Sequence, residues 1–118
     1  MPFDNPITVV ELPEFVAATR KMLDDEEREQ LIEFLAFNPT AGDVIAGTGG
    51  VRKLPWALPG RGKSGGARVI YYYHDERIPL FALEAYAKNR QVNISHAKRN
   101  AFKKVVTAIV AAAKELEQ

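Results

Sequence analysis

One strand-like run, residues 69–73, constrains the fold of this chain more than any other segment. It reads Val-Ile-Tyr-Tyr-Tyr, and β-branched and aromatic residues are enriched in strands. Asp75 and Glu76 follow as a turn, and residues 78–88 then have the composition of a second strand. Strands joined by so short a turn pair antiparallel. The sequence therefore predicts an antiparallel sheet built around this hairpin.

Helical patterns precede the hairpin. Residues 7–12 form a short β-branched run, and Pro13 suits the first turn of a helix, where its missing N–H costs nothing. Asp24 is a suitable cap for a second helix with acids in its first turn. That helix is predicted to end near Phe37, because the residue before Pro39 disfavours the helical conformation. The two helices form an acidic hairpin.

Another strand is predicted at residues 51–54, which Pro55 ends or places at a sheet edge. Ser95 suits the N-cap of a last helix. Helices followed by strands, without regular alternation, indicate an α+β fold with helices over one face of the sheet. At 118 residues we expect a single domain, 1–118.

Strand alternation predicts which side chains share a face. The apolar side chains of the second strand are expected under the helices: Phe81, Leu83, Ala85 and Ala87. The opposite side of that strand carries Glu84, Tyr86 and Lys88. We expect Arg68 to join Tyr86 and Lys88 on an open face of the sheet.

Charge is divided unevenly along the chain, although the formal net charge is only +1. Residues 1–41 hold nine acids and three bases, a net of −6, whereas residues 42–118 hold six acids and 13 bases, a net of +7. Bases and glycines leading into strands suit a phosphodiester backbone, where each cation adds salt-sensitive affinity. Nucleic acid is therefore the expected class of ligand.

Several other classes of protein are excluded. The chain has no cysteine, and its two histidines, His74 and His96, cannot form a zinc site alone. No stretch of 18 apolar residues exists, so no membrane span is expected. The N-terminus lacks the features of a signal peptide. We expect a cytoplasmic protein with no metal and no other cofactor.

Arg61 and Lys63 lie in the glycine-rich segment 60–66. A phosphate-binding P-loop is rejected, because Ala57 stands where that pattern needs glycine and a strand follows instead of a helix. The two cations suit a mobile clamp over a phosphodiester backbone. The alternative is a loop that is simply solvated.

Three residues of the hairpin are candidates for chemistry. The guanidinium of Arg68 can bind two phosphate oxygens at once, although an ion pair with Glu84 is the alternative. Tyr86 and Lys88 would place an aromatic platform or phenolic proton donor beside an amine, unless they form an amphipathic edge of the core. Trp56 and most of the tyrosine run are expected to pack.

Three motifs stand in order before the last helix: GTGGVRKLPWA, GRGKSGGARVIYYY and LFALEAYAKN. With them the chain resembles the RelE/ParE superfamily of toxins of type II toxin–antitoxin systems, closest to the HigB-like branch, over nearly its whole length. The resemblance implies a RelE-like fold, in which two N-terminal helices pack on a central antiparallel sheet with a C-terminal helix. It also implies a metal-independent mRNA interferase, an endoribonuclease that cleaves ribosome-bound mRNA, inhibits translation and arrests growth.

The resemblance assigns roles by motif. Arg68 would stabilise the phosphate, Lys88 would act as base or second cation, and Tyr86 would stack on a base or donate a proton. The residues expected to bind RNA or the ribosome are Arg52 or Lys53, Arg61, Lys63 and Arg90. Ile94 and Asn89 stand where the best-studied members carry a tyrosine and an arginine, so Tyr86 and Arg90 are the candidate substitutes.

The resemblance also implies partners. They are the ribosome with its mRNA and a cognate antitoxin, which the HigB-like likeness suggests is a helix-turn-helix DNA-binding protein. Two other functions stay open: a ParE-like toxin that inhibits DNA gyrase without cleaving nucleic acid, and a non-toxic RNA-binding module. Replacing Arg68 by alanine would abolish the toxicity of a nuclease and leave that of a gyrase inhibitor largely intact.

Overall fold

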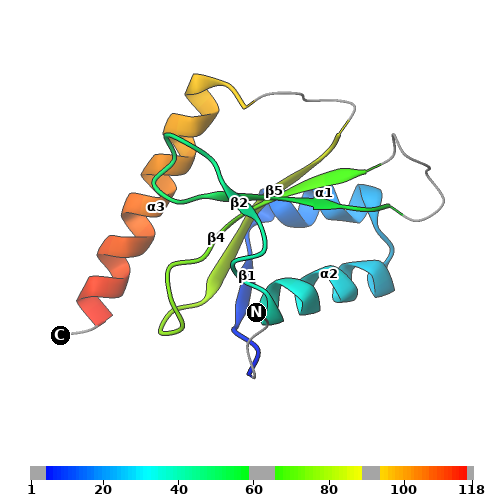
Figure 1. Cartoon of the computed structure of the whole chain (residues 1–118), viewed down its shortest axis with the longest axis horizontal. Helices are drawn as coiled ribbons and strands as arrows, with labels where there is room; N and C mark the ends of the chain where they lie inside the picture. Colours follow the sequence, from blue (N-terminus) through cyan, green and yellow to red (C-terminus); the bar gives the residue numbers. More distant parts are fainter. Residues whose placement is uncertain (1–4, 59–65, 89–93, 117–118) are drawn as a thin grey trace.

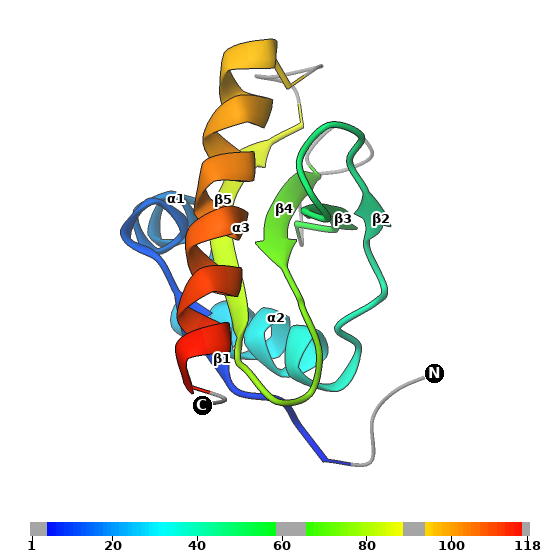
Figure 2. The ribbon, with the colours of Figure 1, turned by 90° about the vertical axis from the view of Figure 1, so that its left-hand side faces the viewer.

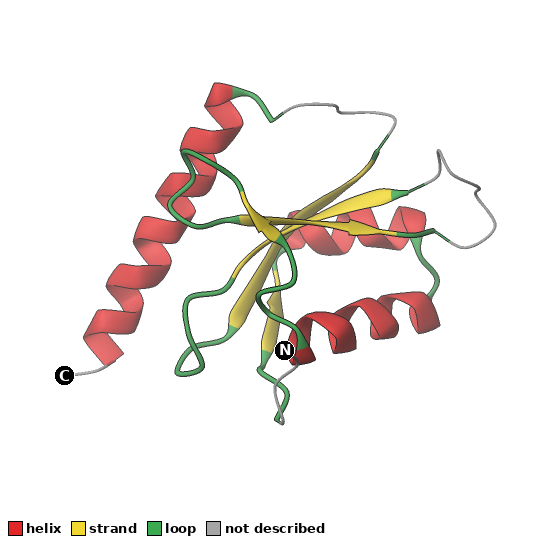
Figure 3. Cartoon of the chain, viewed as in Figure 1, coloured by secondary structure: helices red, strands yellow, loops and turns green. Residues whose placement is uncertain are grey.

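The computed structural model describes residues 5–58, 66–88 and 94–116. Along the chain the elements are β1 (Val9–Glu11), α1 (Pro13–Met22), α2 (Asp25–Phe37), β2 (Asp43–Val44), β3 (Arg52–Trp56), β4 (Ala67–Tyr72), β5 (Leu80–Ala87) and α3 (His96–Leu116). The described strands form one five-stranded sheet in the order β1-β5-β4-β3-β2 (Figure 1). The predicted α+β class is confirmed, as the separate helical and strand regions in Figure 3 show.

The sheet is mixed rather than wholly antiparallel. β2, β3, β4 and β5 pair antiparallel, as the hairpin predicts. β1 instead pairs parallel with β5, with Val9 opposite Leu80 and Glu11 opposite Ala82. This pairing joins two segments separated by most of the chain, so no local pattern could predict it.

The predicted helix starts are confirmed, and those of α2 and α3 carry side-chain caps. Pro13 opens α1. Asp24 and Glu27 form a capping box at α2, in which each backbone N–H donates to the other side chain at 2.8 Å. At α3 the backbone N–H of Lys98 donates to Ser95 Oγ at 3.1 Å. In the described ranges, none of the helices combines the length and the apolar character needed to cross a bilayer.

Helices cover both faces of the sheet, which corrects the prediction that they cover one. α1 and α2 pack on one face, and α3 packs on the other (Figure 2). The first core includes Phe15, Leu31, Leu35, Leu54, Val69 and Tyr71. The second includes Val51, Ile70, Tyr72, Leu83, Phe102 and Val106. The face expected to be open is therefore partly closed by α3, whose apolar stripe needs a surface to bury against.

A β-bulge in β5 corrects the predicted faces of that strand. Neighbouring residues of β4 pair with residues two apart on β5: Ile70 with Glu84, and Tyr71 with Ala82. Leu83 is the extra residue, and such an insertion shifts the alternation of side chains. Leu83 and Phe81 consequently pack with the α3 core, whereas Ala85 lies on the α1 and α2 side as predicted.

Pro55 lies inside β3 rather than ending it. Its partner across the ladder is Arg68 of β4. β2 pairs with β3 only at Arg52 and Lys53, so β3 is an edge strand at Pro55. An edge position tolerates the missing N–H of proline, and the edge alternative is confirmed.

Candidate nucleic-acid interface

The two helical layers carry opposite charge. α2 contains five acidic residues and one arginine, and it lies on the α1 side of the sheet. α3 contains five lysine or arginine residues and one acid, and it lies on the other side. A phosphate backbone is attracted to clustered cations and repelled by carboxylates. The α3 side is therefore where a nucleic acid can bind.

Arg68 and Tyr86 form a directly opposed pair on this side, at the end of the β4–β5 ladder. Cβ atoms in such a pair lie about 4.5–5.5 Å apart. Arg68 is half-buried, and its Nη1 donates to the carbonyl oxygen of Ala67 at 3.1 Å. The alternative ion pair with Glu84 does not form, because Glu84 Oε2 lies 2.8 Å from Lys98 Nζ. Among the described residues Arg68 has no ion pair, which leaves most of its donors available to a ligand.

The phenol of Tyr86 is held in its neutral form. Burial raises its pKa, the charge of Arg68 opposes that shift, and Glu84 adds to it. The net direction is upward. A tyrosine is already protonated at neutral pH, so the hydroxyl can donate a hydrogen bond there. Tyr86 also packs partly against the α3 core. Tyr86 thus lies at the edge of the α3 core, and its hydroxyl can also donate a hydrogen bond.

Lys88 lies next to this pair, directly after β5. Its backbone N–H donates to the carbonyl oxygen of Gly66 at 2.8 Å, which extends the β4–β5 ladder past both strands. The side chain is exposed. The structure thus places Arg68 opposite Tyr86, as predicted, and the Lys88 backbone directly after them along β5. That the Lys88 side chain joins this pair stays a prediction.

The structure separates Arg52 from Lys53. Lys53 pairs with Ile70 and lies on the same side as Arg68, one diagonal step away. Arg52 pairs with Tyr71 on the opposite side. Its Nη1 donates to the carbonyl oxygen of Gly42 at 2.7 Å. Lys53, rather than Arg52, therefore joins the basic face. Arg61, Lys63 and Arg90 lie outside the described residues.

The first turns of α3 supply further cations that the sequence reasoning did not assign. Lys98 pairs with Glu84 and lies 5.8 Å from the centre of the Phe102 ring. Arg99 Nη1 donates to the carbonyl oxygen of Ala46 at 2.6 Å, which ties the helix to the 45–50 loop. The sequence does indicate these cations, since four lysine or arginine residues occur between positions 98 and 104. Lys103 and Lys104 are exposed.

The aromatic residues expected to pack do so. The rings of Trp56 and Phe34 are 5.4 Å apart and tilted by 59°. Tyr71 is buried, and its hydroxyl accepts a hydrogen bond from the Gly42 N–H at 2.8 Å. Tyr72 is buried too, with its hydroxyl 2.9 Å from His74 Nδ1. These rings belong to the scaffold rather than to a stacking surface for bases.

One comparison with known proteins bears on this face. The model of a protein family, described as the RelE toxin of the RelE / RelB toxin-antitoxin system, matches residues 14–118. The matched span runs from α1 to α3 and includes every described residue of the basic face. This match identifies the family and does not distinguish its branches, so the HigB-like branch stays a prediction.

Proposed function

We propose that this chain, which belongs to the RelE family of toxins of toxin–antitoxin systems, is an endoribonuclease that cleaves mRNA on the ribosome. Cleavage would inhibit translation and arrest growth, so the protein would act in the cytoplasm. The observation that carries the proposal is the opposed pair Arg68 and Tyr86, with Lys88 beside it. A guanidinium, a neutral phenol and an amine on one basic face suit phosphodiester chemistry.

The reaction requires three things of the protein. The 2′-hydroxyl of the RNA attacks the adjacent phosphorus, its proton leaves to a base, and the 5′-oxygen departs with a proton from an acid. Arg68 would bind the non-bridging oxygens, whose charge grows in the transition state. Tyr86, whose phenol is protonated at neutral pH, would donate to the leaving oxygen. The RNA supplies its own nucleophile, so the step needs no metal.

Lys88 would serve as the base or as a second cation on the phosphate. Lys88→Arg distinguishes these roles, because arginine keeps the positive charge but does not accept a proton. Nearly unchanged cleavage by Lys88→Arg would support the cation, and a loss as large as that of Lys88→Ala would support the base. Lys114→Ala is a matched control, since Lys114 is an exposed lysine at the far end of α3.

Lys53 and the exposed cations of α3 would bind RNA around this pair. Arg61, Lys63 and Arg90 remain candidates for the same role. Outside the ribosome the chain would be held inactive by a cognate antitoxin, which we expect to be a helix-turn-helix DNA-binding protein.

The deciding experiment maps 5′ ends of a defined mRNA incubated with the purified protein, with and without translating ribosomes. We expect cuts at codon positions only when ribosomes are present. Arg68→Ala should lower the cleavage rate by about 10²–10³-fold, the typical cost of removing one donor to a developing charge. Arg20→Ala should cleave like the unaltered chain, because Arg20 is an exposed arginine on α1, across the sheet.

Intact mRNA in every reaction would contradict the nuclease. A DNA supercoiling assay with gyrase would then test the ParE-like alternative. Unchecked growth of cells that contain the soluble protein would instead favour a non-toxic RNA-binding module.

A further inference from the structure

An ion pair between the first turn of α3 and β5 lies next to the candidate site. Lys98 Nζ is 2.8 Å from Glu84 Oε2, and it lies over the ring of Phe102, 5.8 Å from the ring centre. Phe102 is buried in the α3 core, so the ammonium contacts both a carboxylate and a fixed aromatic face. The Glu84 side chain is only 21% exposed, and a carboxylate so placed needs a partner.

Lys98 occupies a helix position that does not favour a lysine. It is the third residue of α3, and its backbone N–H donates to Ser95 Oγ. A helix N-terminus carries partial positive charge, and a capping box places glutamate or glutamine at this position. Local helix signals therefore do not explain Lys98, and such departures are expected where a residue serves the site.

Arg68 is the cation with which Glu84 would pair if Lys98 were lost. Glu84 stands opposite Ile70 on the β4–β5 ladder. Arg68 is two residues before Ile70, so it is the diagonal neighbour of Glu84, about 7–8 Å away and within reach of a long side chain. Lys53 pairs with Ile70 from the other side, which places it two strands from Glu84, about 9–10 Å away.

The charges of Arg68 and Glu84 both act on Tyr86. Burial raises the pKa of its phenol, the charge of Arg68 lowers it, and that of Glu84 raises it further. The two charged groups therefore lie near the same hydroxyl. A Glu84 carboxylate without Lys98 would compete there for Arg68 and would repel a phosphate.

We propose that Lys98 is a positioning residue of the candidate site: by binding Glu84, it keeps that carboxylate from pairing with Arg68. The inference rests on the proposed function only for the use of Arg68 on phosphate, since the exchange of ion pairs needs no RNA. The two halves of the pair then have unequal effects. Loss of Lys98 frees a competitor for Arg68, whereas loss of Glu84 removes that competitor.

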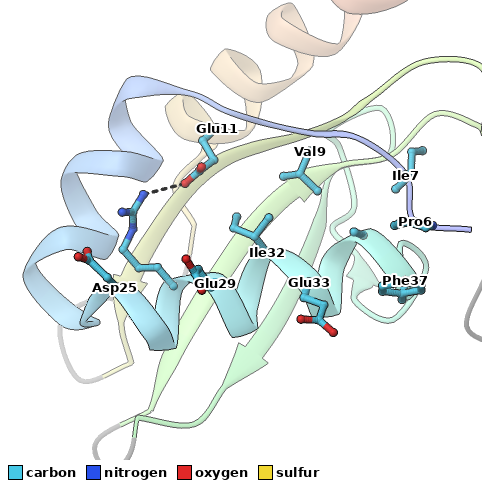
Figure 4. A pocket seen from close by; sticks show the side chains of 11 residues that line it. Pro6, Ile7, Val9, Glu11, Asp25, Glu29, Ile32, Glu33 and Phe37 are labelled. Carbon is cyan, nitrogen blue, oxygen red and sulfur yellow. Dashed lines mark hydrogen bonds and ion pairs between the residues drawn. The ribbon is translucent and has the colours of Figure 1, made fainter.

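A second ion pair between a strand and a helix supplies the matched control (Figure 4). Glu11 Oε1 of β1 accepts a hydrogen bond from Arg28 Nη2 of α2 at 2.9 Å, and both side chains are largely buried. α2 packs on the face of the sheet opposite α3. Arg28→Ala therefore breaks an equivalent contact without freeing a carboxylate near Arg68.

The first measurement uses the free full-length protein and the nitrogen–proton NMR signal of Arg68 Nε, identified by its loss in Arg68→Ala. Lys98→Ala should shift this signal, because a carboxylate then accepts a hydrogen bond from the guanidinium. Lys98→Ala with Glu84→Gln should return the signal to its original place. Thermal melts check that each variant folds.

The second measurement is the rate of mRNA cleavage at saturating ribosomes, where a general loss of electrostatic affinity no longer counts. Lys98→Ala should lower this rate about fivefold, the upper end of what a partly exposed ion pair contributes. Four controls should stay within twofold of the unaltered chain: Glu84→Gln, Lys98→Ala with Glu84→Gln, Lys114→Ala and Arg28→Ala. Lys114→Ala removes one positive charge from an exposed site at the far end of α3.

An Arg68 signal that does not move in Lys98→Ala would overturn the proposal. Equal losses of cleavage in Lys98→Ala and in the double variant would also overturn it, because the ion pair would then only hold α3 on the sheet. If the Arg68 signal moves and returns as expected while no protein cleaves mRNA, the unaltered chain included, the nuclease is contradicted and the positioning role stands.

Discussion

Arg52 and Lys53 are neighbours in the sequence with different predicted roles. Arg52 holds the Gly42 segment from the α1 side of the sheet, whereas Lys53 faces the α3 side with Arg68. We expect Arg52→Ala to lower stability and leave RNA binding nearly intact. We expect Lys53→Ala to weaken RNA binding and leave stability nearly unchanged.

The magnitude for Arg52 follows from its contacts. Its bond to the Gly42 carbonyl at 2.7 Å is partly buried, and a hydrogen bond to a charged group contributes about 1.5–3 kcal/mol. The Arg52 Nε is buried with no hydrogen-bond partner among the described residues, which costs free energy in the folded chain. Arg52→Ala removes that cost, and this offsets about 1 kcal/mol of the lost stability. The net loss is about 0.5–2 kcal/mol. An unfolding entropy of about 2.1 cal/mol/K per residue converts this to a fall in Tm of roughly 2–8 °C.

Lys53 has no hydrogen bond or ion pair in the described part of the chain, and its side chain is half-buried. Its removal should change stability by less than about 0.5 kcal/mol. It should weaken ribosome binding and reduce the slope of log affinity against log salt by about 1.

Thermal melts and salt-dependent ribosome binding of both variants test this reasoning. Equal Tm values for Arg52→Ala and the unaltered chain would refute the structural role of Arg52. A reduced salt slope in Arg52→Ala but not in Lys53→Ala would refute the separation of the two residues.

Three further predictions concern the scaffold. Gly42→Ala should cost about 1–3 kcal/mol in urea denaturation, because an added Cβ would lie 3.0 Å from both the Lys53 carbonyl oxygen and the Tyr71 hydroxyl. Asp24→Ala should cost about 1 kcal/mol by the same assay, through loss of the capping box. Stability should fall as the pH rises above about 10, because burial raises the pKa of the folded tyrosines and the unfolded chain loses those protons first. The tyrosines concerned are Tyr71, Tyr72, Tyr73 and Tyr86, and urea titrations from pH 8 to 11 would detect the fall.

Local signals predicted the elements of the fold except β2, whose two residues lie in a segment expected to be loop. Helix starts at Pro13, Asp24 and Ser95 depend on contacts within four residues, which the sequence displays directly. The β4–β5 hairpin is equally local. The parallel pairing of β1 with β5 and the packing of α3 on the second face depend on residues far apart in the chain. Such contacts leave no periodic pattern in any one segment.

The face of the sheet on which a site residue lies could be predicted only where regular strand alternation decides it. Arg68 and Tyr86 were placed on one face because β4 and β5 are regular at that end. Arg52 and Lys53 were left as alternatives, since the face of each depends on the register of β3 against β4. The cations of α3 were not assigned, because their relevance depends on which face of the sheet the helix covers.

The bulge at Leu83 links the scaffold to the site. Unbroken alternation from Tyr86 would direct Phe81 and Leu83 toward α1 and α2, leaving α3 with less apolar surface on β5. The inserted residue brings both to the α3 side while Tyr86 keeps its place opposite Arg68. One face of the sheet therefore holds α3 at one end and the basic pair at the other. Because Lys98 of α3 also pairs with Glu84, the helix takes up the carboxylate two residues from Tyr86 on β5 and leaves the Arg68 guanidinium available for phosphate.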